Sequence, residues 1–302
     1  MKNKVVILIG LSGSGKSTIA KWLSDEYNAI ILSSDAIREE LGDINSQENN
    51  TKVFEILRTK MVDLLRKGQN VIIDATNLNI KSRKQYIEIG NRFDCEIIAY
   101  IINKRFDRCL EDNSKRDRVV PKNVLERQIR NFQIPFYEEG FDKIEVRCVE
   151  NIKEDNCRVY SLINSMKDFN QENPHHNLTL DKHCDFVSDY LKSKNASERL
   201  ITAGVIHDWA KPYTKTKDEN GIAHYYGHEN YGAYLFLSET WSRRWMDINK
   251  NNALDICFYI NYHMLPHNWQ SEKTQNKYKE LFGKEKYNNL LLFHKADKYR
   301  EE

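Results

Sequence analysis

Near its amino end, this 302-residue chain has a short loop whose residue types and spacing could hold phosphate. Residues 10–18 are GLSGSGKST, which fits the pattern GxxxxGK[ST]. Glycines in such a loop let backbone N–H groups turn toward phosphate oxygens, and the start of the following helix adds positive charge. Lys16 would reach the outer phosphates of ATP, and the Ser17 hydroxyl would complete a Mg²⁺ shell. The predicted nucleotide-binding residues are Gly13, Ser14, Gly15, Lys16, Ser17 and Thr18.

A second set of residues could handle the group that accepts the phosphate. Residues 33–38 are SSDAIR and follow a short apolar run. Asp35 and Arg38 are three residues apart at a predicted helix start, so they share one face. The carboxylate could take a proton from an acceptor hydroxyl, and the arginine could hold a phosphate on that acceptor. The alternative that Asp35 only caps the helix stays open.

Two more charged residues are predicted near the same nucleotide. Asp74 ends the apolar run at 71–73, which is typical of a carboxylate that orients Mg²⁺ through water, with a strand-end cap as the alternative. Arg116 lies in the basic segment NSKRDR at 113–118 and could fold over the ATP phosphates as a lid. A charge run of this kind can also be an ordinary solvated face.

Metal-binding residue types gather in the other half of the chain. All nine histidines lie beyond residue 174, and GVIHDWAKP at 204–212 places His207 and Asp208 together in an apolar helical pattern. Helical periodicity puts four polar side chains on inward faces, namely His183, His207, His263 and Asp297. One divalent cation could satisfy all four if these helices pack together, and it would bring the pKa of its bound water to about 7, creating a nucleophile for phosphorus. For any single histidine, a satisfied core position is the better explanation.

The elements that position these residues follow from the apolar runs. Runs at 4–9, 30–32, 71–73, 96–101 and 144–149 alternate with helical patterns, which predicts a parallel sheet with helices on both faces. Beyond about residue 152 strand patterns vanish and helical periodicity continues to residue 300. We therefore expect an α/β domain at 1–151, a helical linker at 152–173 and an all-α domain at 174–302.

Composition narrows the class of protein. A hydrophobic share of 40% and a charged share of 30% are ordinary for a globular chain, and a net charge of +2 excludes a strongly basic binder of nucleic acid. Six cysteines without a CxxC pair indicate reduced thiols and a cytoplasmic location. No apolar run approaches the roughly 20 residues of a membrane span, and the start leaves no room for a signal peptide.

The first half resembles the phage-type polynucleotide 5′-hydroxyl kinases. GLSGSGKST, SSDAIR, DATNLN and NSKRDRVVP occur in that family's order across residues 1–150. The resemblance implies a P-loop kinase domain that binds ATP and Mg²⁺ through Lys16 and Ser17. It also implies Asp35 as general base on the 5′-hydroxyl, Arg38 as clamp on the acceptor's 3′-phosphate and Arg116 as lid. Some members have aspartate directly before Thr-Asn, whereas Ala75 intervenes here, so the resemblance specifies Asp74 less firmly.

The second half resembles the HD superfamily of metal-dependent phosphohydrolases. The matching pieces are His183, His207-Asp208, His228 in HYYGHENYGA, His263, and Asp297 in HKADKYR. The resemblance implies His183, His207, Asp208 and Asp297 as core ligands of Mn²⁺, Co²⁺, Ni²⁺ or Zn²⁺. It implies that His228 and His263 hold a second metal or the substrate phosphate. We expect His224 to be a loop histidine and Lys211 a surface lysine, although Lys211 could touch phosphate.

Together the two resemblances predict a bifunctional enzyme that heals nucleic-acid ends, RNA rather than DNA. RNA cleavage by internal attack leaves a 2′,3′-cyclic phosphate and a 5′-hydroxyl, whereas ligases need a 3′-hydroxyl and a 5′-phosphate. A kinase and a phosphohydrolase in one chain would convert the first pair of ends into the second, for an RNA ligase acting downstream. A homodimer is left open. The alternatives are a small-molecule or nucleoside kinase with a regulatory HD nucleotide hydrolase, and a nucleotide-dependent switch that controls RNA binding.

Overall fold

The structure is a computed structural model that describes residues 2–42, 49–149, 159–173, 177–240 and 249–298. The chain divides into two compact units, which are described separately here. The first contains residues 1–125 and 135–149, and the second contains residues 126–134 and 150–302. The boundary predicted between residues 151 and 152 falls outside the described residues.

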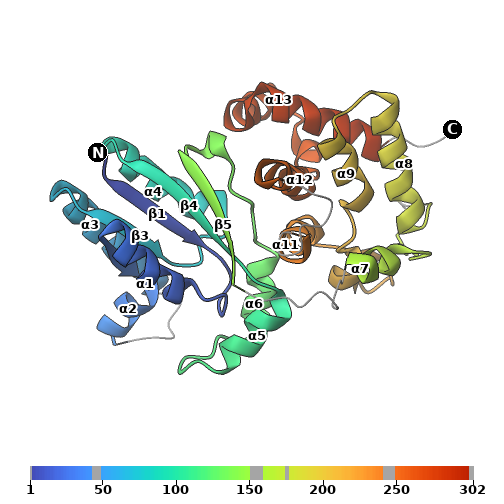
Figure 1. The fold of residues 1–302 in the computed structure, drawn as a ribbon. Coiled ribbons are helices and arrows are strands. Elements are labelled where there is room, and N and C mark those ends of the chain that lie inside the picture. Colours follow the sequence, from blue (N-terminus) through green and yellow to red (C-terminus); the bar gives the residue numbers. More distant parts are fainter. Residues whose placement is uncertain (1, 43–48, 150–158, 174–176, 241–248, 299–302) are drawn as a thin grey trace. The chain divides into compact units, whose positions relative to one another are not determined.

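The first unit contains a parallel sheet, as predicted. Its strands run in the order β2-β3-β1-β4-β5, and every neighbouring pair is parallel (Figure 1). The five runs of apolar residues seen in the sequence correspond to β1 (Lys4–Ile9), β2 (Ala29–Ser33), β3 (Asn70–Asp74), β4 (Glu96–Asn103) and β5 (Lys143–Cys148). The central strands are buried on both faces, which is why they are continuously apolar rather than alternating.

Helices cover both faces of this sheet because successive residues of a strand point to opposite sides. Val6 and Leu8 of β1 pack in one cluster with Ala20 and Leu23 of α1 (Lys16–Tyr27). On the other face, α4 (Ile80–Arg92) approaches β1 and β4 closely at Gly90. The remaining elements of this part of the chain are α2 (Ser34–Glu40), α3 (Asn49–Arg66), α5 (Phe106–Ser114), α6 (Lys122–Ile129) and the 3₁₀ helix η1 (Tyr137–Glu139).

A buried ion pair ties α4 to η1 inside the first unit. The Arg83 guanidinium donates two hydrogen bonds to the carboxylate of Glu139, at 2.7 and 2.9 Å, and both side chains are buried. Arg83 also donates to the carbonyl of Asn77, 3.2 Å away. Asn77 in turn donates to the carbonyl of Leu8 at the end of β1. This chain of bonds supports the loop that follows β1.

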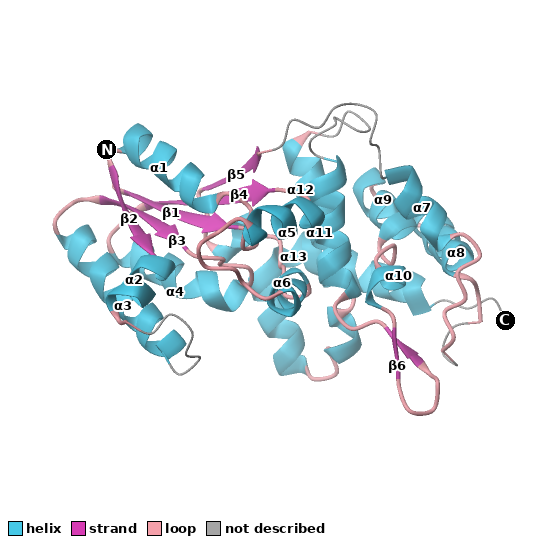
Figure 2. Ribbon diagram, turned by 90° about the horizontal axis from the view of Figure 1, so that it is seen from below, coloured by secondary structure: helices cyan, strands magenta, loops and turns pink. Residues whose placement is uncertain are grey.

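Where its residues are described, the second unit is helical apart from one short hairpin. Its helices are α7 (Val159–Met166), α8 (Leu180–Ser193), α9 (Glu198–Ile206), α10 (Lys211–Thr214), α11 (His228–Thr240), α12 (Lys250–Tyr262), α13 (Glu272–Lys298) and the 3₁₀ helix η4 (Leu265–Asn268). The prediction of an all-α domain missed the antiparallel pair β6 (Thr216–Lys217) and β7 (Ala223–His224), labelled at β6 in Figure 2. Each strand has two residues, too few to show a periodicity in the sequence.

Two segments outside the predicted all-α domain also pack within the helical unit. The side chain of Asn261 accepts from the N–H of Ile134 and donates to the carbonyl of Phe132, so it holds residues 126–134 against α12. Phe132 and Ile134 are fully buried. Within the predicted linker at 152–173, α7 buries three apolar side chains, Val159, Leu162 and Met166. These residues form part of the unit's core.

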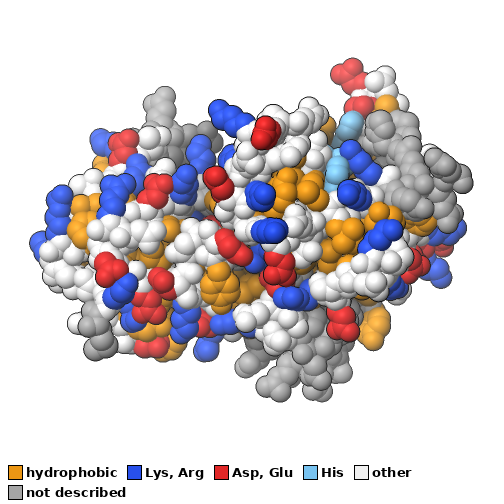
Figure 3. Space-filling model, turned by 90° about the horizontal axis from the view of Figure 1, so that it is seen from above, with side chains coloured by type: hydrophobic (Ala, Val, Ile, Leu, Met, Phe, Trp, Pro, Cys, Tyr) orange, Lys and Arg blue, Asp and Glu red, His pale blue; other side chains and the backbone are white. Residues whose placement is uncertain are grey.

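The surface has the mixed charge expected from a net charge of +2. On the face drawn in Figure 3, basic and acidic side chains are interspersed. Among the described residues, the structure contains no helix long and apolar enough to span a bilayer.

Candidate functional sites

The predicted nucleotide loop lies between β1 and α1, as the motif requires. Gly13 and Gly15 both have positive φ angles, +79° and +93°, which L side chains rarely adopt. Gly13 also needs to lack a side chain, because a Cβ there would stand 2.2 Å from the carbonyl oxygen of Cys109 in α5. The Lys16 ammonium donates to the carbonyl of Leu11, 2.8 Å away, and so stays within the loop.

The strand-end carboxylate meets this loop. The Ser17 hydroxyl donates to Asp74 Oδ2 at 2.9 Å, which joins the two groups predicted to share Mg²⁺. Burial raises the pKa of Asp74 and lowers the pKa of Lys16, because each charged form loses solvation. A Mg²⁺–nucleotide complex would provide the counter-charges that both buried groups need. This geometry supports a Mg²⁺ role for Asp74, despite the intervening Ala75.

Asp35 is surrounded by three guanidinium groups within the first unit. Arg38 and Arg118 contact Asp35 Oδ1 at 3.1 and 3.0 Å, and Arg116 contacts Oδ2 at 3.1 Å. The side chain of Asp35 nevertheless remains 49% exposed. Arg116 and Arg118 come from the segment after α5, so the structure brings the predicted lid to the predicted acceptor residue. Sequence reasoning did not identify Arg118 as a partner of Asp35.

The structure also tests the alternative that Asp35 caps a helix. The residue at the N-cap of α2 is Ser33, whose hydroxyl accepts from the N–H of Ala36 at 3.4 Å. Asp35 lies in the first turn of α2, and its carboxylate oxygens face the arginines. The capping function therefore belongs to Ser33, and the Asp35 carboxylate is available for other chemistry.

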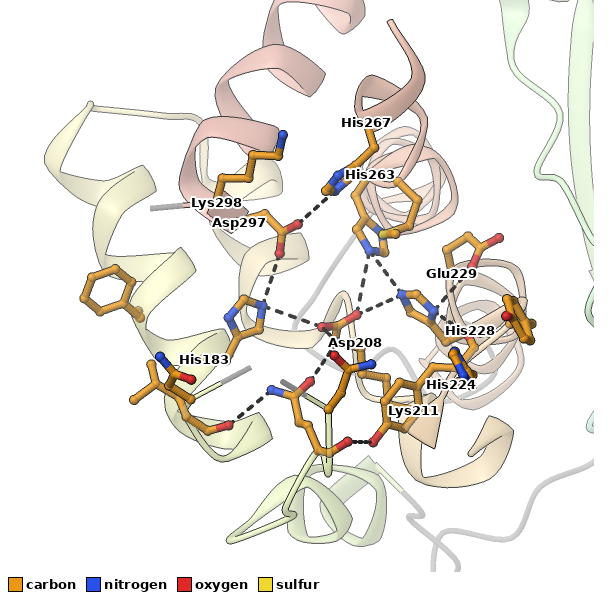
Figure 4. A pocket seen from close by; sticks show the side chains of 18 of the residues that line it. His183, Asp208, Lys211, His224, His228, Glu229, His263, His267, Asp297 and Lys298 are labelled. Carbon is orange, nitrogen blue, oxygen red and sulfur yellow. Dashed lines mark hydrogen bonds and ion pairs between the residues drawn. The ribbon is translucent and has the colours of Figure 1, made fainter. Parts of the chain in front are cut away.

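In the helical unit, six predicted ligands from five segments converge. His183 lies on α8, His207 and Asp208 follow α9, His228 begins α11, His263 follows α12, and Asp297 lies near the end of α13. Five of them are drawn and labelled in Figure 4, where their side chains point toward one another. His207 is fully buried beside them, with its Nε2 3.3 Å from Asp208 Oδ2 and 3.5 Å from Asp297 Oδ1.

The local structure around the His-Asp pair differs from the sequence prediction. We expected both residues inside a helix, but α9 ends at Ile206, His207 is its C-cap and Asp208 lies in the turn that follows. Pro212 lies in the first turn of the next helix, α10, where its missing N–H leaves the carbonyl of Asp208 without the bond of a continuous helix. The N–H of Lys211 donates to that carbonyl instead, closing a tight turn. His263 similarly caps α12 rather than lying within it.

Asp208 is the centre of the cluster because its two oxygens serve two groups of histidines. Oδ2 lies 3.6 Å from His183 Nε2 and 3.3 Å from His207 Nε2. Oδ1 lies 3.0 Å from His228 Nε2 and 3.7 Å from His263 Nε2. Each group has three potential ligand atoms within 4.8 Å of one another, His183-His207-Asp208 and Asp208-His228-His263. Asp297 Oδ1 adds a carboxylate to the first group, 3.1 Å from His183 Nε2.

Three of the imidazoles are fixed by the same backbone contact. The Nδ1 atoms of His207, His228 and His263 each lie 2.7–2.9 Å from the carbonyl three residues earlier. A carbonyl can only accept, so in each neutral ring Nδ1 carries the proton and Nε2 has a free lone pair. All three lone pairs are therefore directed toward Asp208, in the tautomer that a metal requires.

The cluster fits a bound cation by its unsatisfied atoms and its charge. His207 Nε2 and Asp208 Oδ1 are buried without an acceptable hydrogen bond among the described residues, which is costly for polar groups. Burial would lower the pKa of His207, but Asp208 and Asp297 outweigh it and raise this pKa well above its usual value. Burial, followed by the charge of His207, lowers the pKa of His263 to about 3, so that ring is neutral. The site thus combines a neutral donor, His263, with two carboxylates whose field favours positive charge beside His207.

Lys211 is not the surface lysine that we expected. It is only 4% exposed, and its ammonium lies 2.7 Å from Asp208 Oδ2 and 2.8 Å from Gln171 Oε1. It lines the same cavity as Asp208, so contact with a phosphate remains open to it. His267 was not predicted either, although its Nε2 lies 3.4 Å from Asp297 Oδ2. His267 lies in the short 3₁₀ helix η4, after the turn that ends α12, so the sequence has no periodic signal for it.

Comparison with known proteins assigns the first half of the chain. Residues 5–135 match the family model described as AAA domain. A bifunctional polynucleotide phosphatase/kinase of Schizosaccharomyces pombe is 27% identical over 153 residues, covering 47% of this chain and 33% of that protein. A putative bifunctional polynucleotide phosphatase/kinase of Acanthamoeba polyphaga mimivirus is 31% identical over 155 residues, covering 48% and 33%. The chain spans about a third of the length of these two relatives.

Small-molecule kinases are also similar to this part of the chain. A shikimate kinase of Haemophilus influenzae is 25% identical over 178 residues, which covers 55% of this chain and 95% of that enzyme. The first unit therefore has a P-loop kinase fold, which implies ATP and Mg²⁺ as cofactors, and the proteins similar to it include polynucleotide kinases.

Proposed function

We propose that this protein heals nucleic-acid ends, RNA rather than DNA, with two separate phosphate chemistries. The kinase domain phosphorylates 5′-hydroxyl ends, and the helical unit removes 2′,3′-cyclic, 3′- or 2′-phosphates as an HD-type phosphohydrolase. The observation that carries the proposal is the presence, in one chain, of a P-loop with an Asp35–arginine acceptor site and of a buried six-residue His/Asp cluster. An RNA ligase would act on the healed ends.

In the kinase domain, each charged side chain has a defined task. Lys16 and the loop amides hold the transferred phosphate, and Ser17 and Asp74 hold Mg²⁺. Asp35 accepts the proton of the 5′-hydroxyl as that oxygen attacks the γ-phosphorus of ATP, and ADP leaves. Arg38 holds the 3′-phosphate of the same nucleotide, while Arg116 and Arg118 neutralise charge on the transferring group. Their contacts with Asp35 keep these arginines close to the point of reaction.

In the helical unit, the chain's own residues prepare the site for a phosphate ester. His183, His207, Asp208 and Asp297 would hold one divalent cation, and Asp208, His228 and His263 a second. When bound, such a cation supplies Lewis acidity toward the ester and activates water near neutral pH. The backbone carbonyls keep the imidazoles in the ligating tautomer, and Lys211 brings a positive charge beside Asp208 toward the substrate phosphate.

The kinase proposal is tested by substrate choice. An oligonucleotide 5′-hydroxyl, a 3′-phosphorylated nucleoside, a free nucleoside and shikimate are offered with labelled ATP. Arg38→Ala should raise KM for the 3′-phosphorylated acceptor about 10- to 100-fold, because a charge-assisted contact is lost. The control Arg66→Ala removes an exposed arginine paired with Asp63 and should leave KM unchanged. Transfer to shikimate or free nucleoside alone would support the small-molecule alternative instead, which the near full-length similarity to shikimate kinases favours.

The phosphohydrolase proposal is tested by metal removal. Treatment with EDTA should abolish release of phosphate from 2′,3′-cyclic and 3′-phosphate ends and leave these ends intact. Mn²⁺, Co²⁺, Ni²⁺ or Zn²⁺ should restore the reaction, since imidazole-rich sites favour such ions. Bound metal, measured by elemental analysis of the purified chain, should fall with Asp208→Ala. Restoration by Mg²⁺ alone, or hydrolysis that continues in EDTA, would contradict a transition-metal site.

A further inference from the structure

An aromatic pair lies at the mouth of the cavity that contains the His/Asp cluster. Tyr226 is 70% exposed, and the ring of His224 stacks parallel to it, with centroids 5.4 Å apart and planes 5° apart. His224 comes from β7, and Tyr226 lies two residues before the candidate ligand His228. We call His224 and Tyr226 the aromatic platform.

The aromatic platform is held in place by its own hairpin. Asp218 accepts from the N–H groups of Asn220 and Ile222, which closes the turn between β6 and β7. The other oxygen of Asp218 lies 3.0 Å from His224 Nε2 and fixes that ring. Between His224 and Tyr226 in the chain, Tyr225 is buried, and its hydroxyl donates to the carbonyl of Gln171. The two rings are therefore positioned before any ligand arrives.

The aromatic platform shares one cavity with the cluster. The cavity has a volume of about 1230 Å³ and is lined by His224 and Tyr226 as well as by Asp208, His228 and His263. In Figure 4 His224 lies on the Lys211 side of the cluster, whereas Lys298 and His267 lie beyond Asp297. A single phosphate would fill only a small part of this space, because cavities of about 300–1,000 Å³ already hold whole drug-sized ligands.

We propose that the aromatic platform binds the nucleobase of the nucleotide whose phosphate enters the His/Asp cluster. Stacking accepts any base because every base has a π-face, so the site would recognise the nucleoside without reading sequence. The His224 ring extends the stacking surface of Tyr226, and Lys211 lies between this surface and the cluster. This inference rests on the proposed phosphohydrolase function and adds to it the substrate class, a terminal nucleotide rather than a free phosphate ester.

The test compares two exposed tyrosines in two assays. Tyr226→Ala removes the platform, and the matched control Tyr160→Ala removes a 66% exposed tyrosine of α7 that is not among the residues lining the cavity. The first assay is the ratio of kcat/KM for a 2′,3′-cyclic oligonucleotide to kcat/KM for p-nitrophenyl phosphate, which has no base. This ratio should fall about tenfold in Tyr226→Ala, keep the wild-type value in Tyr160→Ala and recover in Tyr226→Trp.

The second assay needs no hydrolysis. The fluorescence of 2-aminopurine at the 3′-terminal position of an RNA should be quenched when the RNA binds the protein in EDTA. The affinity for this RNA, measured from the quenching, should be about tenfold lower in Tyr226→Ala. An equal effect of Tyr160→Ala, or quenching that is the same with the probe placed five nucleotides inward, would overturn the platform. Terminal quenching without any hydrolysis by the metal-loaded protein would support the platform while contradicting the phosphohydrolase proposal.

Discussion

The two units present their candidate phosphate sites with opposite constructions. In the kinase domain the candidate site is a contiguous loop, residues 10–18, in which backbone N–H groups and one lysine would do most of the binding. The helical unit uses side chains from five segments, which are spread over more than a hundred residues between His183 and Asp297. The residues of a contiguous loop are adjacent in the sequence, so a motif can predict how they are arranged. The residues of a dispersed cluster come together only when the whole unit has folded.

The largest expected effect comes from removing the shared carboxylate of the helical unit. Asp208→Ala deprives both histidine groups of their common oxygen donor, so phosphohydrolase kcat/KM should fall at least about 1000-fold, the loss of several kcal/mol of transition-state stabilisation. Kinase kcat/KM on a 5′-hydroxyl end should stay at the wild-type value. Asp189→Ala, on the exposed side of α8, is the control and should change neither activity. A parallel fall of both activities would show that the two sites are not independent.

The converse change in the kinase domain has the next largest effect. Lys16→Ala removes the cation nearest the transferred phosphate, and kinase kcat should fall about 100- to 1000-fold. The loop amides remain, so the loss is smaller than that expected for Asp208→Ala. Phosphate release from 3′ ends should be unaffected. Lys21→Ala, an exposed lysine on α1, serves as the matched control, and an equal loss in that variant would contradict a specific function for Lys16.

A smaller effect tests whether residues 126–134 belong to the helical unit. Asn261→Ala removes the bonds that hold residues 126–134 in the helical unit, which should cost about 2 kcal/mol locally. Hydrogen exchange at the N–H of Ile134 should therefore become about 30-fold faster. The control Asn289→Ala removes a bond to the Tyr259 hydroxyl and should leave that amide protected. Unchanged exchange in Asn261→Ala would place residues 126–134 outside the cooperative core of the helical unit.

The contrast between the units explains how much the sequence could predict. All five strands of the parallel sheet were found, because central parallel strands are continuous apolar runs bounded by helical patterns. The positions of the loop and of Asp74 in the fold could be predicted because the loop follows β1 and Asp74 ends β3. The burial of Lys211 and the turn at Asp208 were missed, since helical periodicity does not mark where α9 ends and α10 begins.

Long-range contacts were beyond any local pattern. The hydrogen bond between Arg118 and Asp35 joins residues 83 positions apart in the sequence, and the one between Ile134 and Asn261 joins residues 127 positions apart. Likewise, the stacking of His224 on Tyr226 depends on a hairpin whose strands have two residues each. Such contacts are set by the packing of whole elements, so residue type and spacing alone leave them open.

The central claim, that one chain contains two independent phosphate sites, is tested most directly on a single RNA with a 5′-hydroxyl and a 2′,3′-cyclic phosphate. Lys16→Ala and Asp208→Ala proteins are each incubated with this RNA, ATP and a divalent transition metal, separately and then mixed. Lys16→Ala should convert only the 3′ end, Asp208→Ala only the 5′ end, and the mixture both. Loss of both conversions in either single variant, or a mixture that fails to restore them, would contradict the account.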